Sequence, residues 1–213
     1  MKKIMFNDKF SLTQAVIDGR KTQTRRIIKC RKTFKGEWVA GFNIHIRPSD
    51  KKVIGLPCMY DADESEFDEG EILPKYKVGE VIAVAQSYRD CGGVNEYGVP
   101  MWEIISQRVG GTNAGWDNKM FVRGDLMPHK IHITDVRVER LQDISDEDCI
   151  KEGVRKVVNE NGIYVQYYVG KGDNACSFEN PREAFAHLIN KVTGKDAWES
   201  NPWVWVYDFE LIK

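Results

Sequence analysis

Long apolar runs are absent from this chain of 213 residues. None of its hydrophobic stretches approaches the ~20 residues that a membrane-spanning helix needs. The first residues, Met1 to Asn7, include two lysines but lack the apolar segment of a secretory signal peptide. We therefore expect neither membrane insertion nor export, and we predict a cytoplasmic protein. The content of 42% hydrophobic and 30% charged residues is typical of a soluble globular domain.

Cysteine and histidine are scarce. The five cysteines are odd in number and no two form a C-x-x-C pair, which argues against a disulfide framework and against a structural zinc site. His129 and His132 lie three residues apart, without a cluster of further metal ligands beside them. The G-x-G-x-x-G, P-loop and G-x-S-x-G motifs are missing too, which disfavours nucleotide-cofactor and serine-hydrolase folds. We predict no metal and no organic cofactor.

The charges are nearly balanced overall but unevenly distributed, with a net charge of −1. Residues 1–35 contain eleven Lys and Arg and two acids, a local balance of 11 − 2 = +9. Residues 61–71 contain seven acids and no base. This asymmetry suits a protein that binds an anionic ligand on one side. A solvated basic face beside an acidic loop is the plainer explanation, and charge alone does not separate the two.

Short strands and short helices are spread along the chain. The clearest strand covers residues 130–141, where a change of phase near Thr134 and Asp135 predicts a bulge. An amphipathic helix is predicted over residues 181–192. This interleaving favours an α+β fold with a mostly antiparallel, barrel-like sheet and a few short helices. The other expected elements are strands at 22–28, 81–84, 164–169 and 203–211, helices at 11–19 and 145–153, an irregular segment at 31–75, and a long loop at 91–118 with one short strand at 101–106.

The segment from Gly19 to Arg26, Gly-Arg-Lys-Thr-Gln-Thr-Arg-Arg, is the most informative stretch. It places four cations and two hydroxyls directly behind a short helix that Ser11 or Thr13 can cap and Gly19 can end. Such a segment can bind a phosphate, polarise a carbonyl or supply an activated hydroxyl. It can also be a solvated basic strand.

Four segments of the chain belong together: residues 19–26 with the helix before them, the turn at 77–80, the strand-and-helix unit at 135–153, and the ending at 201–206. They resemble the ASCH domain family and occur in the order typical of it. The last of them is similar to the ending of larger, often phage-encoded or prophage-encoded members. The resemblance implies a PUA-like, mostly antiparallel β-barrel with a few short helices. It further implies one domain over residues 1–213, with insertions near 31–75 and 91–125.

The resemblance also implies candidate functions. PUA-like domains commonly bind RNA, and one small bacterial ASCH enzyme is an amidohydrolase that removes the acetyl group from N4-acetylcytidine. The lysine, threonine and glutamate of that enzyme fall on Lys21, Thr24 and Glu152 of this sequence. Lys21, with its pKa lowered by the neighbouring arginines, would take the proton of the Thr24 hydroxyl. Glu152 would handle a proton on the leaving amine or orient the amide.

Five further residues are predicted to bind the ligand, namely Arg20, Arg25, Arg26, Gln86 and Ser87. In larger relatives the strand after the glycine turn ends in Arg-Glu-Thr, whereas this chain has Ala, Gln and Ser at the same three places. The change removes one charge of each sign. It weakens the prediction of catalysis more than that of binding, because Gln86 and Ser87 can still hydrogen-bond a base edge.

Three hypotheses follow. The leading one is binding of RNA, a nucleotide or a nucleoside in a basic cleft at residues 20–26, and the second is the amidohydrolase. The third is an accessory surface that binds a host protein. Trp203 and Trp205 share one face of a strand, and we predict that they pack against the last helix. Aromatic side chains available for stacking on RNA bases are Phe34, Trp38, Tyr88, Trp102 and Trp116.

Overall fold

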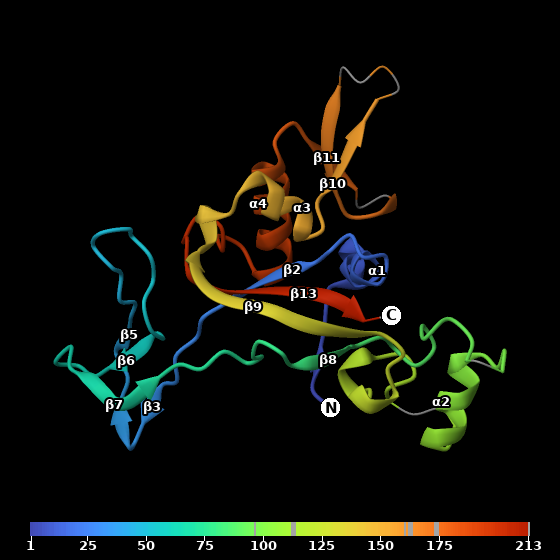
Figure 1. The fold of residues 1–213 in the computed structure, drawn as a ribbon, viewed down its shortest axis with the longest axis horizontal. Helices are drawn as coiled ribbons and strands as arrows, with labels where there is room; N and C mark the ends of the chain where they lie inside the picture. Colours follow the sequence, from blue (N-terminus) through green and yellow to red (C-terminus); the bar gives the residue numbers. More distant parts are fainter. Residues whose placement is uncertain (96, 112–113, 160, 162–163, 173–174, 213) are drawn as a thin grey trace.

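The computed structural model describes residues 1–95, 97–111, 114–159, 161, 164–172 and 175–212. A five-stranded sheet lies at the centre of the molecule (Figure 1). Its neighbouring strands are antiparallel, except that β1 and β8 are parallel. Across the sheet the strands are β1 (Lys3–Ile4), β8 (Val81–Val84), β9 (Lys130–Arg140), β13 (Trp203–Ile212) and β2 (Gln23–Ile27).

The sheet is open, although we expected a barrel. Among the described residues no strand ladder joins the two edges, β1 and β2. The mixed α+β class and the mostly antiparallel sheet are confirmed. Arg26 of β2 donates a hydrogen bond to the backbone carbonyl of Met5, just after β1, so the two edges are bridged by a side chain where a barrel would have backbone pairing.

The longest strand pair, β9 with β13, contains the predicted bulge. Asp208 pairs with Asp135 while Phe209 pairs with Ile133, so Thr134 is skipped in the register. An extra residue in one strand bends it and increases its twist. Figure 1 shows β9 curving along the whole length of β13.

Two helices cover one face of this sheet, α3 (Asp146–Lys151) and α4 (Pro181–Thr193) (Figure 1). Asn180 caps α4 through a hydrogen bond from the amide of Arg182, and Pro181 occupies its first turn. Ala184, Phe185 and Leu188 are buried, which confirms the amphipathic helix predicted there. Beside the helices, a separate antiparallel sheet consists of β10 (Arg155–Val158), β11 (Val165–Val169) and β12 (Cys176–Phe178).

The tryptophans of β13 do not pack against α4, contrary to our prediction. Val204 lines a cavity together with residues of α4. Alternation along the strand turns Trp203 and Trp205 to the opposite face, where they line a groove beside residues 46–56. Arg140 lies over the ring of Trp203, 4.2 Å from its centroid. The alternation along the strand predicted that the two tryptophans share one face, but it did not predict which part of the protein covers that face.

The first helix, α1 (Leu12–Ile17), is short and half-buried. Ser11 precedes it in the left-handed region, with φ of 57°, and does not cap it through its side chain, so that expectation was wrong. Gly19 adopts the predicted left-handed conformation, with φ of 72°. The chain then reverses and enters β2.

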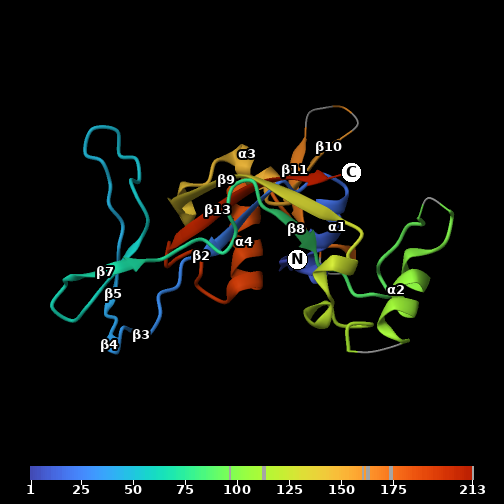
Figure 2. The same ribbon diagram turned by 60° about the horizontal axis from the view of Figure 1, so that its bottom comes forward.

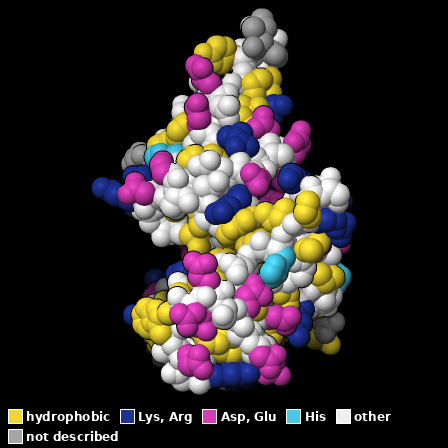
Figure 3. All heavy atoms as spheres, turned by 90° about the vertical axis from the view of Figure 1, so that its left-hand side faces the viewer, with side chains coloured by type: hydrophobic (Ala, Val, Ile, Leu, Met, Phe, Trp, Pro, Cys, Tyr) yellow, Lys and Arg dark blue, Asp and Glu magenta, His cyan; other side chains and the backbone are white. Residues whose placement is uncertain are grey.

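Residues 31–75 form a projecting arm, not the irregular segment that we expected. Figures 1 and 2 show the arm at one end of the main sheet. The acidic run lies in this arm, and Figure 3, which views the molecule from the arm's side, shows acidic side chains over its lower part. The arm contains the pair β3 (Thr33–Phe34) and β4 (Glu37–Trp38) and the sheet of β5 (Gly41–Asn43), β6 (Cys58–Tyr60) and β7 (Glu66–Glu71).

Residues 101–106 form a helix and not the expected strand. The helix α2 (Met101–Val109) begins after Pro100 and ends at Gly110, which has φ of 75°. Its Ile105 is buried in a small second cluster with Tyr88 and Cys91. Met101, Ile105 and Val109 recur every four residues, and this helical spacing prevails over the local alternation. Short 3₁₀ turns occupy Asp8–Phe10, Lys119–Phe121, Gly124–Leu126 and Leu141–Asp143.

Candidate functional site

Lys21 and Glu152, predicted to act together, form a buried ion pair. The amide of Lys21 donates to the carbonyl of Ala15, which fixes the backbone of Lys21 against the end of α1. Its Nζ lies 2.7 Å from Glu152 Oε2 and also donates to the backbone carbonyls of Gln23 and Glu152. The side chains are only 2% and 6% exposed. All three ammonium hydrogens therefore have an acceptor inside the protein.

The position of Glu152 is set by the end of α3. Ser145 caps the start of this helix by accepting a hydrogen bond from the amide of Asp148. Glu152 closes the helix and is followed by Gly153 with φ of 107°. A Cβ at Gly153 would lie 3.0 Å from Leu12 Cδ2 and 3.6 Å from Lys21 Cδ. The glycine therefore lets α3 end directly against α1 and Lys21.

Arg25 links this pair to other carboxylates. Its Nη1 lies 3.3 Å from Glu152 Oε1, and its Nη2 lies 3.0 Å from Glu139 and 3.2 Å from Asp148. The guanidinium is fully buried, and its Nε has no hydrogen-bond partner among the described residues. Arg25 therefore fixes the carboxylate of Glu152 and is neutralised in doing so.

Thr24 lies in the same cavity wall as the pair. A cavity of about 420 Å³ is lined by Lys21, Thr24, Arg25 and Glu152, with Phe6 and residues of α4 among its other walls. The Thr24 hydroxyl makes no hydrogen bond with any described residue. The structure thus brings the three predicted catalytic residues to one cavity and leaves the hydroxyl free to react.

The pKa of Lys21 is lowered, but the main cause is not the one that we predicted. Burial is the main reason that the pKa of Lys21 is lowered, and the negative charge of Glu152 partly raises it again. The like charges of Arg26 and Arg25 lower this pKa as well, but they are the smaller contributions. Burial disfavours a charged pair compared with a neutral amine beside a neutral carboxylic acid.

The four cations of residues 20–26 do not form one basic cleft. Lys21 and Arg25 are inside the protein and paired with carboxylates. Arg26 is exposed and donates to the carbonyl of Met5. Arg20 is exposed, pairs with Asp18, and lines a different cavity.

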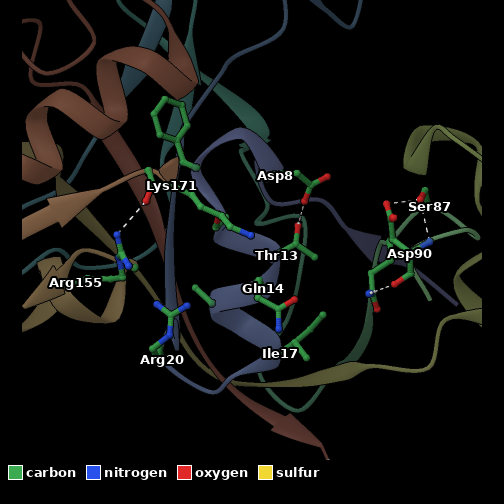
Figure 4. Close-up of a pocket in the computed structure, with 15 residues that line it drawn as sticks. Asp8, Thr13, Gln14, Ile17, Arg20, Ser87, Asp90, Arg155 and Lys171 are labelled. Carbon is green, nitrogen blue, oxygen red and sulfur yellow. Dashed lines mark hydrogen bonds between the residues drawn. The ribbon is translucent and has the colours of Figure 1, made fainter. Parts of the chain in front are cut away.

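Gln86 and Ser87 lie apart from the Lys21 cavity. They line a second cavity of about 620 Å³ that also includes Arg20 (Figure 4). Gln86 donates to the carbonyl of Asp90, and Ser87 donates to the Asp90 carboxylate at 2.5 Å. The predicted site residues are therefore divided between two cavities.

Sequence reasoning missed the carboxylates that hold Arg25. From the sequence, Asp148 is only a helix-start residue and Glu139 only part of a strand. A usable signal existed, because Asp135, Arg137 and Glu139 place a charge at every second position and hence on one strand face. Arg137 does bond to both of these strand acids. Such a charged face requires charged partners on the neighbouring elements.

Among the described residues no group of three or more His, Cys, Asp or Glu side chains could hold a metal ion. No helix in that part of the chain is long and apolar enough to cross a membrane. No family model, no curated protein and no solved structure matches this chain. The function therefore has to be inferred from the geometry of the two cavities.

Proposed function

We propose that this protein is an amidohydrolase that acts on an N-acylated nucleoside such as N4-acetylcytidine in the Lys21 cavity. The observation that carries the proposal is the buried contact between Lys21 and Glu152 beside the unengaged hydroxyl of Thr24. Glu152 lies 131 positions from Lys21 in the chain, so the fold brings them together. The cavity of about 420 Å³ lies within the range of small-molecule sites.

The chemistry begins with the neutral form of the pair. Transfer of one proton from Lys21 to Glu152 across their 2.7 Å contact yields an amine and a carboxylic acid. The amine takes the proton of the Thr24 hydroxyl as its oxygen attacks the acyl carbonyl. The C–N bond breaks, and the leaving nitrogen takes the proton of Glu152. Water then cleaves the acyl-threonine, giving one proton to Glu152, while Lys21 returns a proton to Thr24.

A purely structural ion pair is the competing explanation. Buried pairs contribute little net stability compared with apolar side chains of similar size, so stability alone does not account for this one. The neighbouring carboxylates already give Arg25 its partners, and the free Thr24 hydroxyl has no structural task in the described contacts. Both features favour a catalytic role of Lys21, Thr24 and Glu152 over a purely structural one.

The test is a mass-spectrometric turnover assay of the purified protein with N4-acetylcytidine. The matched variants are Thr24→Val and Thr22→Val, two neighbouring threonines of which only Thr24 lines the cavity. We expect Thr24→Val and Lys21→Met to lower kcat by at least about a thousandfold. Thr22→Val should change it by no more than about threefold. Absence of cytidine release by the folded wild-type protein, even at high enzyme concentration, would refute this activity.

Binding of single-stranded RNA is the second candidate. A groove of about 600 Å³ is lined by Lys3, Arg26, Lys29 and Lys75 and by no carboxylate. Arg26 and Lys29 also line the Lys21 cavity, so the groove continues into it. The charge of this groove suits a phosphate backbone.

The aromatic side chains limit how RNA could bind. Tyr88 is buried and Phe34 packs against Phe67, so neither is available to a base. Trp38 and Trp102 are exposed, but they lie on the arm and on α2. The structure therefore favours contacts of the groove with the phosphate backbone of RNA over stacking on its bases.

The family assignment is likewise a proposal. The order of strands and helices and the place of Lys21, Thr24 and Glu152 support a PUA-like ASCH member of the larger, phage-type kind. The open edge between β1 and β2, bridged by Arg26, would be where the barrel closes. A cytoplasmic location is also a proposal, and it depends on the proposed substrates.

A further inference from the structure

The second cavity is a groove that lies across α1 and does not include the proposed catalytic residues. It is bordered by residues 153–155 and 170–171 on one side and by residues 86–90 on the other. Figure 4 shows Arg20, Arg155 and Lys171 on one side of α1, and Ser87 and Asp90 across from them. The groove therefore has one basic and one acidic wall.

The basic wall is assembled from three separate segments. Arg20 follows α1, Arg155 begins β10, and Lys171 follows β11. Arg155 Nη2 donates to the carbonyl of Gly170 at 3.2 Å, which holds the guanidinium beside Lys171. Gly170, between Arg155 and Lys171 in this lining, has no side chain to cover its backbone. Arg20 is also paired with Asp18 at 3.0 Å, and the three cations share one wall of the groove, where they can contact a phosphate group.

The opposite wall offers hydrogen-bonding groups to a neutral, polar part of a ligand. Gln86 and Ser87 are more than nine-tenths buried, and both are oriented by Asp90. Gln86 is also held by His129 Nδ1, 2.7 Å from its Oε1. Thr13 bonds to Asp8 on the same side. Amide, hydroxyl and carboxylate groups together can accept from amino or hydroxyl donors.

The charges select the class of ligand. Lys119 pairs with Asp8 at 2.6 Å, whereas Asp90 has no ion pair with any described residue, so the phosphates of an RNA strand would be repelled at Asp90. A small ligand with a single phosphate and several donors satisfies both walls, and a volume of about 620 Å³ suits one. We propose that this groove binds a nucleoside monophosphate, with the phosphate at Arg20, Arg155 and Lys171 and the nucleoside toward Gln86, Ser87 and Asp90.

This site is separate from the proposed hydrolase, and its test does not use turnover. Calorimetric titrations of the full chain with cytidine monophosphate, cytidine and inorganic phosphate give the affinities. Arg155→Glu and Lys171→Glu should each weaken binding of the monophosphate by about tenfold or more. Lys156→Glu is the matched control, because Lys156 follows Arg155 on β10 but does not line the groove. Its affinity should stay within about threefold of the wild type.

Circular dichroism of each variant verifies folding, and Lys171→Glu tests the same wall without disturbing the hydrogen bond of Arg155. We expect cytidine to bind at least about tenfold more weakly than its monophosphate. Equal losses in Lys156→Glu and Arg155→Glu would show unspecific attraction and overturn the site. Failure of the folded wild type to bind the monophosphate would overturn it too. A loss of binding in folded Lys21→Met would place the ligand in the other cavity.

Discussion

Lys21 and Glu152 would lose different amounts of stabilisation if either partner were removed. Without Lys21, the Glu152 carboxylate still has Arg25 at 3.3 Å. Without the Glu152 carboxylate, Lys21 keeps only two backbone carbonyls as acceptors and no counterion. At the scale of single residues, the lysine therefore depends on the glutamate more than the reverse.

We therefore expect Glu152→Gln to destabilise the fold by about 3–5 kcal/mol at pH 7, and Lys21→Met by less. Burial lowers the pKa of Lys21 in the folded state, and loss of Glu152 lowers it further. Between that value and the ordinary lysine value, the unfolded chain binds more protons, so the stability of Glu152→Gln should rise with pH. Urea unfolding at pH 7 and pH 9 measures this.

The exposed Glu210→Gln is the control and should leave the free energy of unfolding nearly unchanged. If Glu152→Gln were as stable as the wild type and its stability did not vary with pH, Lys21 would not be a buried charge that depends on Glu152.

At the scale of elements, the junction between α3 and α1 determines the site. Gly153 combines a φ of 107° with close approach to Leu12 and Lys21. A side chain there would be strained by its backbone conformation and would also press on Leu12, whose Cδ2 would lie 3.0 Å from the new Cβ. One glycine therefore couples the end of a helix to the position of the proposed base.

Gly153→Ala should lower the free energy of unfolding by about 1–3 kcal/mol. It should also reduce turnover of N4-acetylcytidine, because the strain at Gly153 acts on Glu152, the residue directly before it. Gly92→Ala is the matched control, since Gly92 does not have a positive φ and its added Cβ meets nothing within 4 Å. Denaturant unfolding and the turnover assay, run on both variants, check this. Equal stability of the two variants would contradict the proposed strain at Gly153.

At the scale of the whole molecule, the basic groove adjoins the Lys21 cavity, with which it shares Arg26 and Lys29. Neither residue lines the second cavity. The groove of Lys3, Arg26, Lys29 and Lys75 follows the open edge of the sheet. The acidic run of residues 61–71, by contrast, lies in the arm at one end of the molecule (Figures 1 and 2). The long-range field therefore directs a polyanion to the sheet edge and not to the arm.

If single-stranded RNA binds along this edge, Lys29→Glu and Arg26→Glu should weaken it. Each should also make the slope of log binding constant against log salt concentration less steep, by about 0.7 for every phosphate that the groove no longer neutralises. Lys191→Glu on the exposed face of α4 is the control, since Lys191 lines no part of the groove. Fluorescence anisotropy with a labelled oligonucleotide over a range of salt concentrations measures both. Equal effects of Lys191→Glu and Lys29→Glu would exclude the groove as the RNA site.

Elements with a strong local pattern could be predicted from the sequence. The strand of residues 130–141 with its bulge and the helix of residues 181–192 follow from apolar spacing and from Asn180 and Pro181. Residues 101–106 were wrongly predicted as a strand. Six residues of mixed polarity fit both the helical period of about 3.6 residues and the strand period of two. The strands of the arm are two to six residues long, too short for either period to be distinct.

The amino-acid sequence by itself determined the local elements, the capping of α3 by Ser145 and the left-handed turn at Gly19. Through its resemblance to a family, it also determined which lysine, threonine and glutamate to consider together. Only the tertiary structure decided that Arg25 is neutralised inside, that Arg20 and Gln86 belong to a second cavity, and that the sheet edge is open. The physical reason is the distance along the chain over which the interactions act. Helix caps and apolar periodicity involve residues within a few positions of one another. The contact of Lys21 with Glu152 spans 131 positions and depends on how several elements pack together.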